Sequence, residues 1–445
     1  MTKKLNVIMM TIDSLRADHL GAYGYHRDTS PRMDALAEEG ALVEDFVCPG
    51  IPTHVSYTTM YTGQHPVTHG IVAHAGRNVL SRQAPFLSEI LVDEGYNTVA
   101  FDNLLRARAW FGRGYEFYID SSLRRPLVVN ITCEEINKRA IEWLRMYRDE
   151  QPFFMFFHYW DPHYPFVPPD KYRNLFYEGD NPADPSDHSL DQWYKAPFGS
   201  IARDTWLRTP KGVVRDPAYV EALYDQEIRH MDDGIAQILG ALDEFGLSDN
   251  TLTILVADHG ESMDEHNIFY EHHGLYESVL RVPFMARLPG RIPKGLRLPV
   301  TRQHFDIAPT ILEAVGTRVP PEMDGRSFWK QLCGEEEASG YDTVVSLECS
   351  WQAKWSLRTK PHKFILSREQ DIYGTPMREL YDYVEDPKEV NNLVDEKPEL
   401  AASMEAELEA WIADRLRQLG RTTDPVVEHG VSLVADGNPL LQGIF

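Results

Sequence analysis

The chain has 445 residues, of which 44 are Lys or Arg and 68 are Asp or Glu, giving a formal net charge of −24. This acidic excess argues against nucleic acid or an anionic membrane as a partner, because both require a basic face. No apolar run reaches the length of a membrane span, and the opening MTKKLNVIMMTID lacks the features of a cleavable signal segment.

The four cysteines show no paired spacing of the kind that binds a metal; they are Cys48, Cys133, Cys333 and Cys349. We therefore expect free thiols in a reducing compartment, and hence a cytoplasmic protein. The length is sufficient for two domains, or for one large α/β domain with a cap.

The first predicted element is the apolar strand LNVIMMT at residues 5–11, which ends just before Asp13. Taken alone, Asp13 is as well explained by a turn as by a ligand role. Arg16 follows on the same turn. Residues 30–40 open with Ser-Pro and close with Gly, which predicts a helix with the serine as its N-cap.

The segment PGIPTHVSYTTMYTGQHPVTHGI at residues 49–71 predicts a rigid turn that brings Thr53 to the start of a short helix. Backbone amides at a helix N-terminus stabilise an anion. A hydroxyl at that place, beside a divalent cation, can lose its proton and attack phosphorus or sulfur. The alternative is that Thr53 is simply the N-cap of the helix.

Two further strands and a helix are predicted in the middle of the chain. YNTVAFD at 96–102 is a strand, and a threonine caps a helix over 132–148. The apolar run within 152–166 is a buried strand that ends in polar residues, including His158 and His163. His163 stands between two prolines in a turn, so we expect it to contact substrate.

Residues 167–216 show no periodicity, and a segment of this length is usually a functional lid or disordered. Its tryptophans and arginines favour an ordered lid. Residues 216–246 then predict a long amphipathic helix that opens with Asp-Pro and closes with Gly.

The densest group of metal-type ligands follows the predicted buried strand TLTILVA at 251–257. Asp258 and His259 stand at the end of this strand, as Asp13 does at the end of the first. In a parallel sheet both ends meet at one edge, so these three side chains could converge on one ion. Four more candidates follow in the same loop, namely Glu261, His266, His272 and His273. The alternative is an acidic surface loop with incidental histidines.

The rest of the chain predicts the closure of the main domain and a second, smaller one. RVPF at 281–284 begins an edge-type strand, because proline cannot donate to a neighbouring strand. We place the main domain at 1–340 and a smaller α+β domain, with short strands and a helix from about 398 to 420, at 341–420. The tail 421–445 ends in apolar PLLQGIF, which is either an arm on a neighbouring subunit of a homo-oligomer or a strap along its own chain.

Motifs along nearly the whole chain, from Asn6 to Leu393, resemble the sulfatase branch of the alkaline phosphatase superfamily. They are NVIMMTIDSLRADHLGAYGY, TGQHPVTHGI, FHYWDPHYPF, LVADHGE, LYE followed by RVPF, FDIAPTILEAVG, DGRSFW and ELYDYVEDPKEVNNL. The resemblance implies an α/β fold with a central mixed sheet between helices, a smaller C-terminal sheet domain, and metal-assisted attack on a sulfate or phosphate centre.

Position by position, the resemblance places metal ligands at Asp13, Asp258 and His259, and the nucleophile at Thr53. We expect the Thr53 hydroxyl to bind the ion as well. Sulfatases carry at that position a cysteine, inside C-x-P-x-R, that is converted to formylglycine, and this chain has neither the cysteine nor the arginine. Ser14 stands where many sulfatases have a second aspartate.

Histidines that touch the substrate are implied at His163 and at His272 or His273. Further candidates for substrate contact are Arg16, as a replacement for the missing arginine, Tyr57 and His266. Glu261 and His266 could also orient the ligands. One divalent ion is expected, and Mn²⁺, Mg²⁺, Ca²⁺ and Zn²⁺ all suit oxygen and nitrogen donors.

A threonine ester cannot collapse to an aldehyde as formylglycine hydrate does, so water must cleave it at the central atom. This favours phosphorus over sulfur, and the sequence predicts a hydrolase of small anionic phosphodiesters or phosphonate monoesters with a covalent Thr53 intermediate. The alternatives are a sulfuric ester hydrolase without formylglycine, a phosphoryl transferase or mutase, and a binding protein without activity.

Overall fold

The centre of the molecule is a mixed eight-stranded sheet in the computed structural model, which describes residues 4–74, 78–122, 131–150 and 152–431. In sheet order its strands are β11 (Leu296–Gln303), β2 (Ala41–Val47), β10 (Arg281–Arg287), β9 (Thr251–Ala257), β1 (Asn6–Ile12), β6 (Phe153–Tyr159), β4 (Asn97–Phe101) and β5 (Phe117–Ile119). β1 runs parallel to both of its neighbours, whereas β10 runs antiparallel to β9 and β2.

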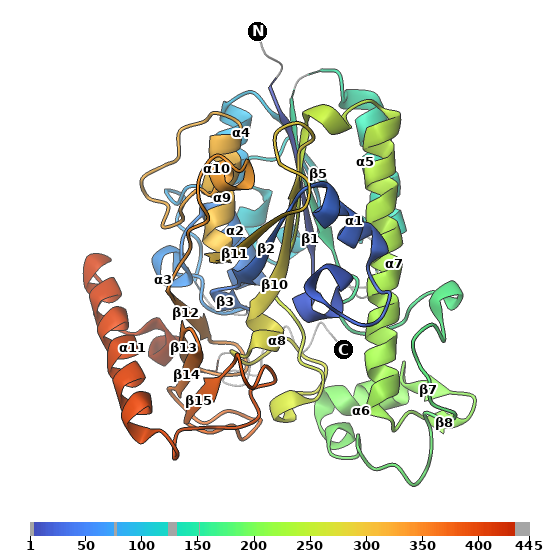
Figure 1. Ribbon diagram of the computed structural model, residues 1–445, viewed down its shortest axis with the longest axis vertical. Coiled ribbons are helices and arrows are strands. Elements are labelled where there is room, and N and C mark those ends of the chain that lie inside the picture. Colours follow the sequence, from blue (N-terminus) through green and yellow to red (C-terminus); the bar gives the residue numbers. More distant parts are fainter. Residues whose placement is uncertain (1–3, 75–77, 123–130, 151, 432–445) are drawn as a thin grey trace.

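The central strands β1, β6 and β9 are buried along their whole length, which explains their continuous apolar sequences. Helices cover both faces of the sheet (Figure 1). On one face lie α2 (Thr53–Thr62), α4 (Leu87–Asp93), α9 (Ile307–Ala314) and α10 (Trp329–Leu332); on the other lie α1 (Pro31–Glu39), α5 (Cys133–Tyr147) and α7 (Pro217–Glu244). The predicted α/β fold with a central mixed sheet between helices is confirmed.

The predicted ends of the two long helices α5 and α7 agree with the structure within two residues. Thr132 and Glu135 form a capping box at the start of α5. The Asp216 side chain accepts the Ala218 amide at the start of α7, which carries proline at its first position.

The cap of α1 differs from the prediction. Ser30 occupies the N-cap position, but its side chain makes no capping hydrogen bond. Instead, the amides of Arg32 and Met33 donate to the Asp232 carboxylate on α7, at 2.9 and 2.8 Å from Oδ1. The Asp232 carboxylate thus takes the capping role expected of the Ser30 hydroxyl, because α1 packs against α7.

The prediction of an edge strand at residues 281–284 is wrong. β10 lies inside the sheet, between β2 and β9. Its pairing with β2 shifts register between Val282 and Phe284, and Pro283 sits at this irregularity. A bulge is one of the few interior places that tolerate a residue without an amide hydrogen.

A second sheet lies beside the first and contains β15 (Arg378–Asp382), β14 (His362–Ser367), β13 (Lys354–Thr359), β12 (Thr343–Glu348) and β3 (Gly50–Ile51). Four of these strands come from the predicted C-terminal domain, and α11 (Pro398–Gln418) packs against β13 and β14. β3 comes from the segment just before Thr53. The domain boundary after residue 340 stays a prediction.

Short helices complete the fold, namely α3 (Pro66–His69), α8 (Glu277–Leu280) and α12 (Pro425–His429). The apolar PLLQGIF end of the tail lies outside the described residues, so its role as an arm or a strap stays a prediction. Among the helices of the described residues, none combines the length and the apolar character that a membrane crossing requires.

The segment 167–216 is folded, with α6 (Pro197–Asp204) and a hairpin of β7 (Arg208–Thr209) and β8 (Gly212–Val213). Trp193 is buried against Tyr270, with ring centroids 4.8 Å apart. Aromatic contacts of this kind order a segment that has little regular structure. The predicted order is confirmed, whereas the role of the segment as a lid stays a prediction.

Candidate active site

The sheet register brings the three predicted metal ligands together. Ile12 of β1 pairs with Ala257 of β9, so Asp13 leaves the sheet beside Asp258 and His259. His259 Nε2 lies 3.2 Å from Asp258 Oδ2 and 3.9 Å from Asp13 Oδ1. All three side chains are fully buried.

Backbone and side-chain groups of the same two loops hold the carboxylates in place. Ser14 has a left-handed backbone with φ of 59°, and its hydroxyl donates to Asp13 Oδ1 over 2.8 Å. The amides of Ser14 and His259 both donate to Asp258 Oδ1, at 3.2 and 2.8 Å. Ser14 therefore orients both carboxylates.

The donors of this cluster fit a divalent cation. Asp258 Oδ2 is buried and accepts no hydrogen bond from the described residues. Burial and the neighbouring Asp13 raise the pKa of Asp258 far above its ordinary value. Burial also raises the pKa of Asp13, but His163, His158 and His259 together lower it to about 2. Two buried carboxylates and an imidazole with a shared centre need a positive charge between them, and one cation bound by all three would supply it.

Thr53 faces this cluster from the start of α2. Pro52 occupies the N-cap position of the helix, so the alternative of Thr53 as N-cap is wrong. The Thr53 hydroxyl lies 3.2 Å from His259 Nε2 and is almost fully buried. The helix N-terminus adds partial positive charge at this point, which favours an anion.

The hydrogen bond on the other side of His259 fixes which ring nitrogen carries the hydrogen. Nδ1 lies 3.0 Å from the Gly260 carbonyl and must donate to it. Burial lowers the pKa of His259 to about 4, so the ring is neutral. Nε2 is therefore left with its lone pair toward Thr53, Asp13 and Asp258, as a metal ligand or as an acceptor for the hydroxyl.

Of the two neighbouring histidines, His272 is the one beside His259. Their rings stack with centroids 4.6 Å apart, and the His163 ring lies 5.0 Å from His272 on another side. Burial, with the neighbouring His259, lowers the pKa of His272 well below its ordinary value. His273 instead donates from Nδ1 to Glu348 of the second sheet over 2.9 Å.

Three predicted contact residues are not part of this group. The Arg16 guanidinium binds Asp18 and Glu265, so its charge is already neutralised. Tyr57 is fully buried in the core and donates to the Thr11 hydroxyl. The His266 ring stacks on Tyr276, with centroids 3.5 Å apart, and lies beside Tyr381 of the second sheet.

Glu261, predicted to orient the ligands, lies close to the cluster. It is fully buried, and its Oε2 is 4.0 Å from His272 Nδ1. Burial, and Asp13 next, raise the pKa of Glu261 far above its ordinary value. Glu261 therefore resembles Asp258: burial and the nearby Asp13 carboxylate disfavour the charged form of both carboxyl groups.

Sequence reasoning missed the group behind Asp13. His158 donates from Nε2 to Asp13 over 3.2 Å and from Nδ1 to Asp102 over 2.8 Å. Burial lowers the pKa of His158, but the bonds to Asp102 and Asp13 raise it to about 9, so the ring is cationic at neutral pH. His158 stands near the end of β6 and Asp102 follows β4, and both strands run parallel to β1. This shared position at the ends of parallel strands could have indicated from the sequence that the two residues lie near Asp13.

A second missed group lies at the start of α2. The His54 and His74 rings stack with centroids 3.8 Å apart, and Arg108 donates to the His74 carbonyl over 3.1 Å. His74 lies close enough to His259 and His273 for their charges to affect its pKa, which burial chiefly holds well below the ordinary value. No spacing pattern in the sequence links these loops.

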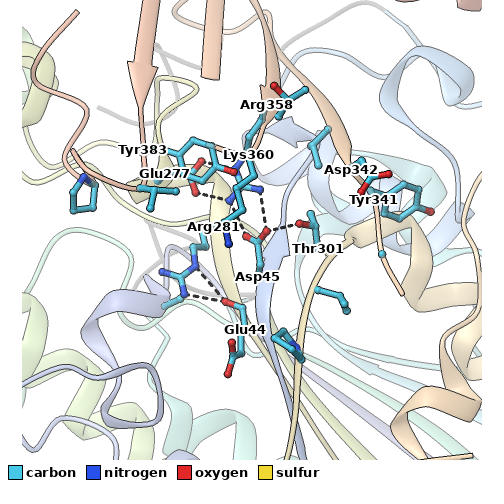
Figure 2. Close-up of a pocket in the computed structure, with 18 of the residues that line it drawn as sticks. Glu44, Asp45, Glu277, Arg281, Thr301, Tyr341, Asp342, Arg358, Lys360 and Tyr383 are labelled. Atoms are coloured by element: carbon cyan, nitrogen blue, oxygen red, sulfur yellow. Dashed lines mark hydrogen bonds and ion pairs between the residues drawn. The ribbon is translucent and has the colours of Figure 1, made fainter. Parts of the chain in front are cut away.

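A cavity of about 830 Å³ lies elsewhere, in the seam between the two sheets (Figure 2). Its charged side chains are largely paired with one another: Arg358 binds both Asp45 and Glu277, and Arg281 donates to the Glu44 carbonyl. None of the predicted site residues lines it. The cavity is therefore separate from the candidate active site.

Known proteins with similar structures share this fold. The chain aligns with a phosphonate monoester hydrolase of Agrobacterium radiobacter at a TM-score of 0.74 and 19% identity, over 93% of this chain and 96% of that one. It aligns with a putative sulfatase from Bacteroides thetaiotaomicron at a TM-score of 0.72 and 21% identity, over 95% and 96% of the two chains.

Similar sequences lead to the same group of enzymes. An arylsulfatase of Clostridium perfringens is 24% identical, over 99% of this chain and 98% of that protein. Residues 264–417 match the model of the N-sulphoglucosamine sulphohydrolase C-terminal region. Residues 5–317 match the sulfatase family model, so the chain belongs to the sulfatase family and is an ester hydrolase.

Proposed function

We propose that the protein hydrolyses a small anionic ester at the centre formed by Asp13, Thr53, Asp258 and His259, with Thr53 as nucleophile. The carrying observation is the position of the Thr53 hydroxyl, 3.2 Å from a histidine nitrogen that is turned toward two buried carboxylates. A hydroxyl, a lone pair and a cation-binding cluster in contact are the parts that nucleophilic attack on an anionic ester requires.

Asp13, Asp258 and His259 would hold the divalent ion. When bound, such an ion supplies positive charge that lowers the pKa of the Thr53 hydroxyl and offsets the charge of the substrate. Around it, Ser14 fixes the two carboxylates through its hydroxyl and its amide. The N-terminus of α2 adds further amides at the place where the anion would sit.

The reaction proceeds in two displacements. The Thr53 hydroxyl gives its proton to the imidazole of His163 or His272 as Oγ1 forms a bond to the central sulfur or phosphorus. The bond to the leaving oxygen breaks, and that oxygen takes up the same proton. Water then attacks the central atom, the bond to Thr53 breaks, and the hydroxyl regains a proton. We assign this proton transfer to His163 and His272, because the His272 ring lies 4.6 Å from that of His259 and 5.0 Å from that of His163. Burial lowers the pKa of His272, so this ring accepts a proton before it donates one.

We take a sulfuric ester as the first candidate substrate. The full-length relative from Clostridium perfringens is named an arylsulfatase, and a relative from Bacteroides thetaiotaomicron, 24% identical over 88% of this chain, is named an N-acetylglucosamine-6-O-sulfatase. This choice reverses the preference for phosphorus drawn from the sequence alone.

Phosphonate monoesters and phosphodiesters are the second candidates, because of the residue at the nucleophile position. A threonine ester has no internal route of collapse, so both halves of the reaction occur at the central atom. Hydrolysis of a covalent enzyme ester at phosphorus fits this requirement. A partial relative from Trinickia caryophylli, 29% identical over 47% of this chain, is named a multifunctional alkaline phosphatase superfamily protein.

The test is a paired assay of the metal-loaded protein on p-nitrophenyl sulfate, a p-nitrophenyl phosphonate and bis(p-nitrophenyl) phosphate. T53A should lose at least about 10³-fold in turnover, as expected when a nucleophile is removed, while metal binding persists. T62A, at the other end of the same helix, is the matched control and should keep its activity.

Mass spectrometry of the quenched protein identifies the central atom. A sulfated or phosphorylated Thr53 peptide in the wild type, absent from T53A, would support the nucleophile and name the substrate class. Full activity in T53A would overturn the assignment. A faster reaction on both phosphorus substrates than on the sulfate would move the second candidate to first place.

A further inference from the structure

A second group of metal-type ligands lies away from the catalytic cluster, where α5 packs against α7. Cys133, at the start of α5, and His230, on α7, are both buried, and Glu134 lies half-exposed beside them. Gly234 allows this approach: a Cβ at that position would stand 2.6 Å from the Cys133 sulfur. The three side chains therefore meet because α7 lacks a side chain there.

The distances from the Cys133 sulfur to the other two donor atoms match those of a tetrahedral zinc site. Cys133 Sγ lies 3.6 Å from His230 Nε2 and 3.6 Å from Glu134 Oε2. Ideal tetrahedral zinc bonds to sulfur, nitrogen and oxygen would place a sulfur about 3.5 Å from the other two donors. Glu134 Oε1 and Oε2 are both 2.9 Å from His230 Nε2, as a direct hydrogen bond requires, and would move apart slightly on binding.

The carboxyl groups around His230 outnumber the single positive charge that its protonated ring can supply. Glu227 Oε2 lies 3.5 Å from the other ring nitrogen, Nδ1, which is buried and makes no hydrogen bond. Asp161 also approaches this ring, so three carboxyl groups surround one imidazole. In the described part of the chain, the ion pairs of Glu134 and Glu227 run to His230 alone.

A similar cluster in the same protein shows how such charges are otherwise balanced. His19, Glu221 and Asp225 also come within ligand distance of one another. There, Arg27 binds both carboxylates and supplies the positive charge. The Cys133 cluster has no such arginine among its ion pairs in the described residues, and it contains a thiol. Thiolate is a ligand that selects zinc over magnesium or calcium.

We propose that Cys133, Glu134 and His230 form a zinc site separate from the catalytic centre, with Glu227 orienting the His230 ring. Binding would release the proton of the Cys133 thiol and that of His230 Nε2, while Nδ1 keeps its hydrogen and donates it to Glu227. Water completes the four ligands on the exposed side of Glu134. Carboxyl groups lie at both nitrogens of the His230 ring: Glu134 at Nε2 and Glu227 at Nδ1. The ring can therefore bind the metal through Nε2 while Nδ1 donates to Glu227.

The site would brace the turn that carries His163. The Cys133 amide donates to Asp161 Oδ2 over 3.1 Å, and His163 follows two residues after Asp161. Zinc at this place would therefore fix the start of α5, and through Asp161 the turn that carries His163.

The test uses the full chain, stripped with a chelator and reloaded with Co²⁺ alone. A thiolate ligand gives cobalt a charge-transfer absorption in the near ultraviolet that oxygen and nitrogen ligands do not give. The wild type should show it, C133S should lose it, and C333S, which removes another buried cysteine, should keep it. Elemental analysis after zinc loading should find about one equivalent less per chain in C133S than in C333S.

The D13N variant separates this site from the catalytic one, because it should lose activity and keep the cobalt–thiolate absorption. E134Q, at a half-exposed position, gives a second variant if C133S fails to fold, and it should weaken the absorption at limiting Co²⁺. A wild type without the absorption would overturn the proposal. His230 would then act as a cation clamped between Glu134 and Glu227.

Discussion

At the scale of single residues, the position of Asp13 depends on a chain of charges behind it. His158 binds Asp13 on one side and Asp102 on the other, and all three side chains are buried. A carboxylate held in this way keeps one orientation toward its ligand, because rotation would break a charge-assisted hydrogen bond.

Replacing Asp102 should therefore weaken metal binding without touching a metal ligand. D102N removes the charge that keeps His158 cationic, and we expect an affinity about 10- to 100-fold lower, as for other groups that orient ligands. Calorimetric titration of the stripped protein measures this. Y118F is the matched control. Tyr118 donates to the other Asp102 oxygen, so its removal leaves the bond between His158 and Asp102 intact and should leave metal affinity unchanged. Equal affinities in D102N and wild type would contradict the link.

The residues that sequence could place are those next to the strands that carry them. Asp13 and Asp258 follow buried apolar runs directly, and the parallel sheet brings such ends together. Arg108, His74 and Glu348 come from loops and from the second sheet, and their approach depends on tertiary packing that no local pattern encodes. Which of His272 and His273 lies beside His259 also depends on a carboxylate far away in the sequence, Glu348, which binds His273.

At the scale of elements, α1 depends on α7 for its cap. The Asp232 carboxylate accepts two amides of the first turn of α1, a role that the sequence assigned to Ser30. Local capping rules found the right helix start but the wrong partner. For Pro283 the local rule was right that proline disturbs strand pairing, but the predicted edge position was wrong. A bulge accommodates Pro283 inside the sheet.

Removing this cap should cost stability and spare activity. D232A leaves two amides of α1 without their acceptor, and we expect the free energy of unfolding to fall by about 1–2 kcal/mol. Urea denaturation of wild type and variant measures the loss. D233A, at the next and partly exposed position, removes a carboxylate that binds Tyr172 instead and should cost less. Equal losses in both variants would argue against the capping role.

At the scale of the whole molecule, the two sheets are joined by buried charge. Glu277 on α8 binds Arg358 of β13 and Lys363 of β14, over 2.9 and 2.7 Å. Burial alone would raise the pKa of Glu277, but Lys363 and Arg358 lower it to about 2. The Glu277 carboxylate thus shares in neutralising two cations of the second sheet, together with Asp45 at Arg358 and Glu389 at Lys363.

The stability of this seam should depend on pH with a known sign. A carboxyl whose pKa falls from 4.5 to about 2 on folding stabilises fully above 4.5, and its contribution is lost as the pH falls toward 2. E277Q should therefore be less stable than wild type by about 3 kcal/mol at neutral pH, since Arg358 and Lys363 each lose one of their carboxylate partners. The difference should close in acid. Denaturation curves across this range measure it.

E44Q serves as the control for that comparison, because Glu44 pairs with Arg297 at the exposed rim of the same seam. An exposed pair of this kind contributes about 1 kcal/mol or less, so its removal should leave the acid dependence almost unchanged. A difference between E277Q and wild type that persists at the lowest pH would contradict the role of Glu277 as a charged link.

The two-residue strand β3 pairs with a strand that is synthesised much later, so the surroundings of Thr53 form only late in protein synthesis. Gly50 and Ile51, just ahead of Thr53, pair with Leu347 and Glu348 in β12. A ribosome adding about 5–20 residues per second needs roughly 15 to 60 s to travel between these segments. During that interval the nascent chain holds the segment of Thr53, the proposed nucleophile, without its partner strand. A chain that ends between His259 and Leu347 would therefore carry all three predicted metal ligands and lack the partner strand of β3.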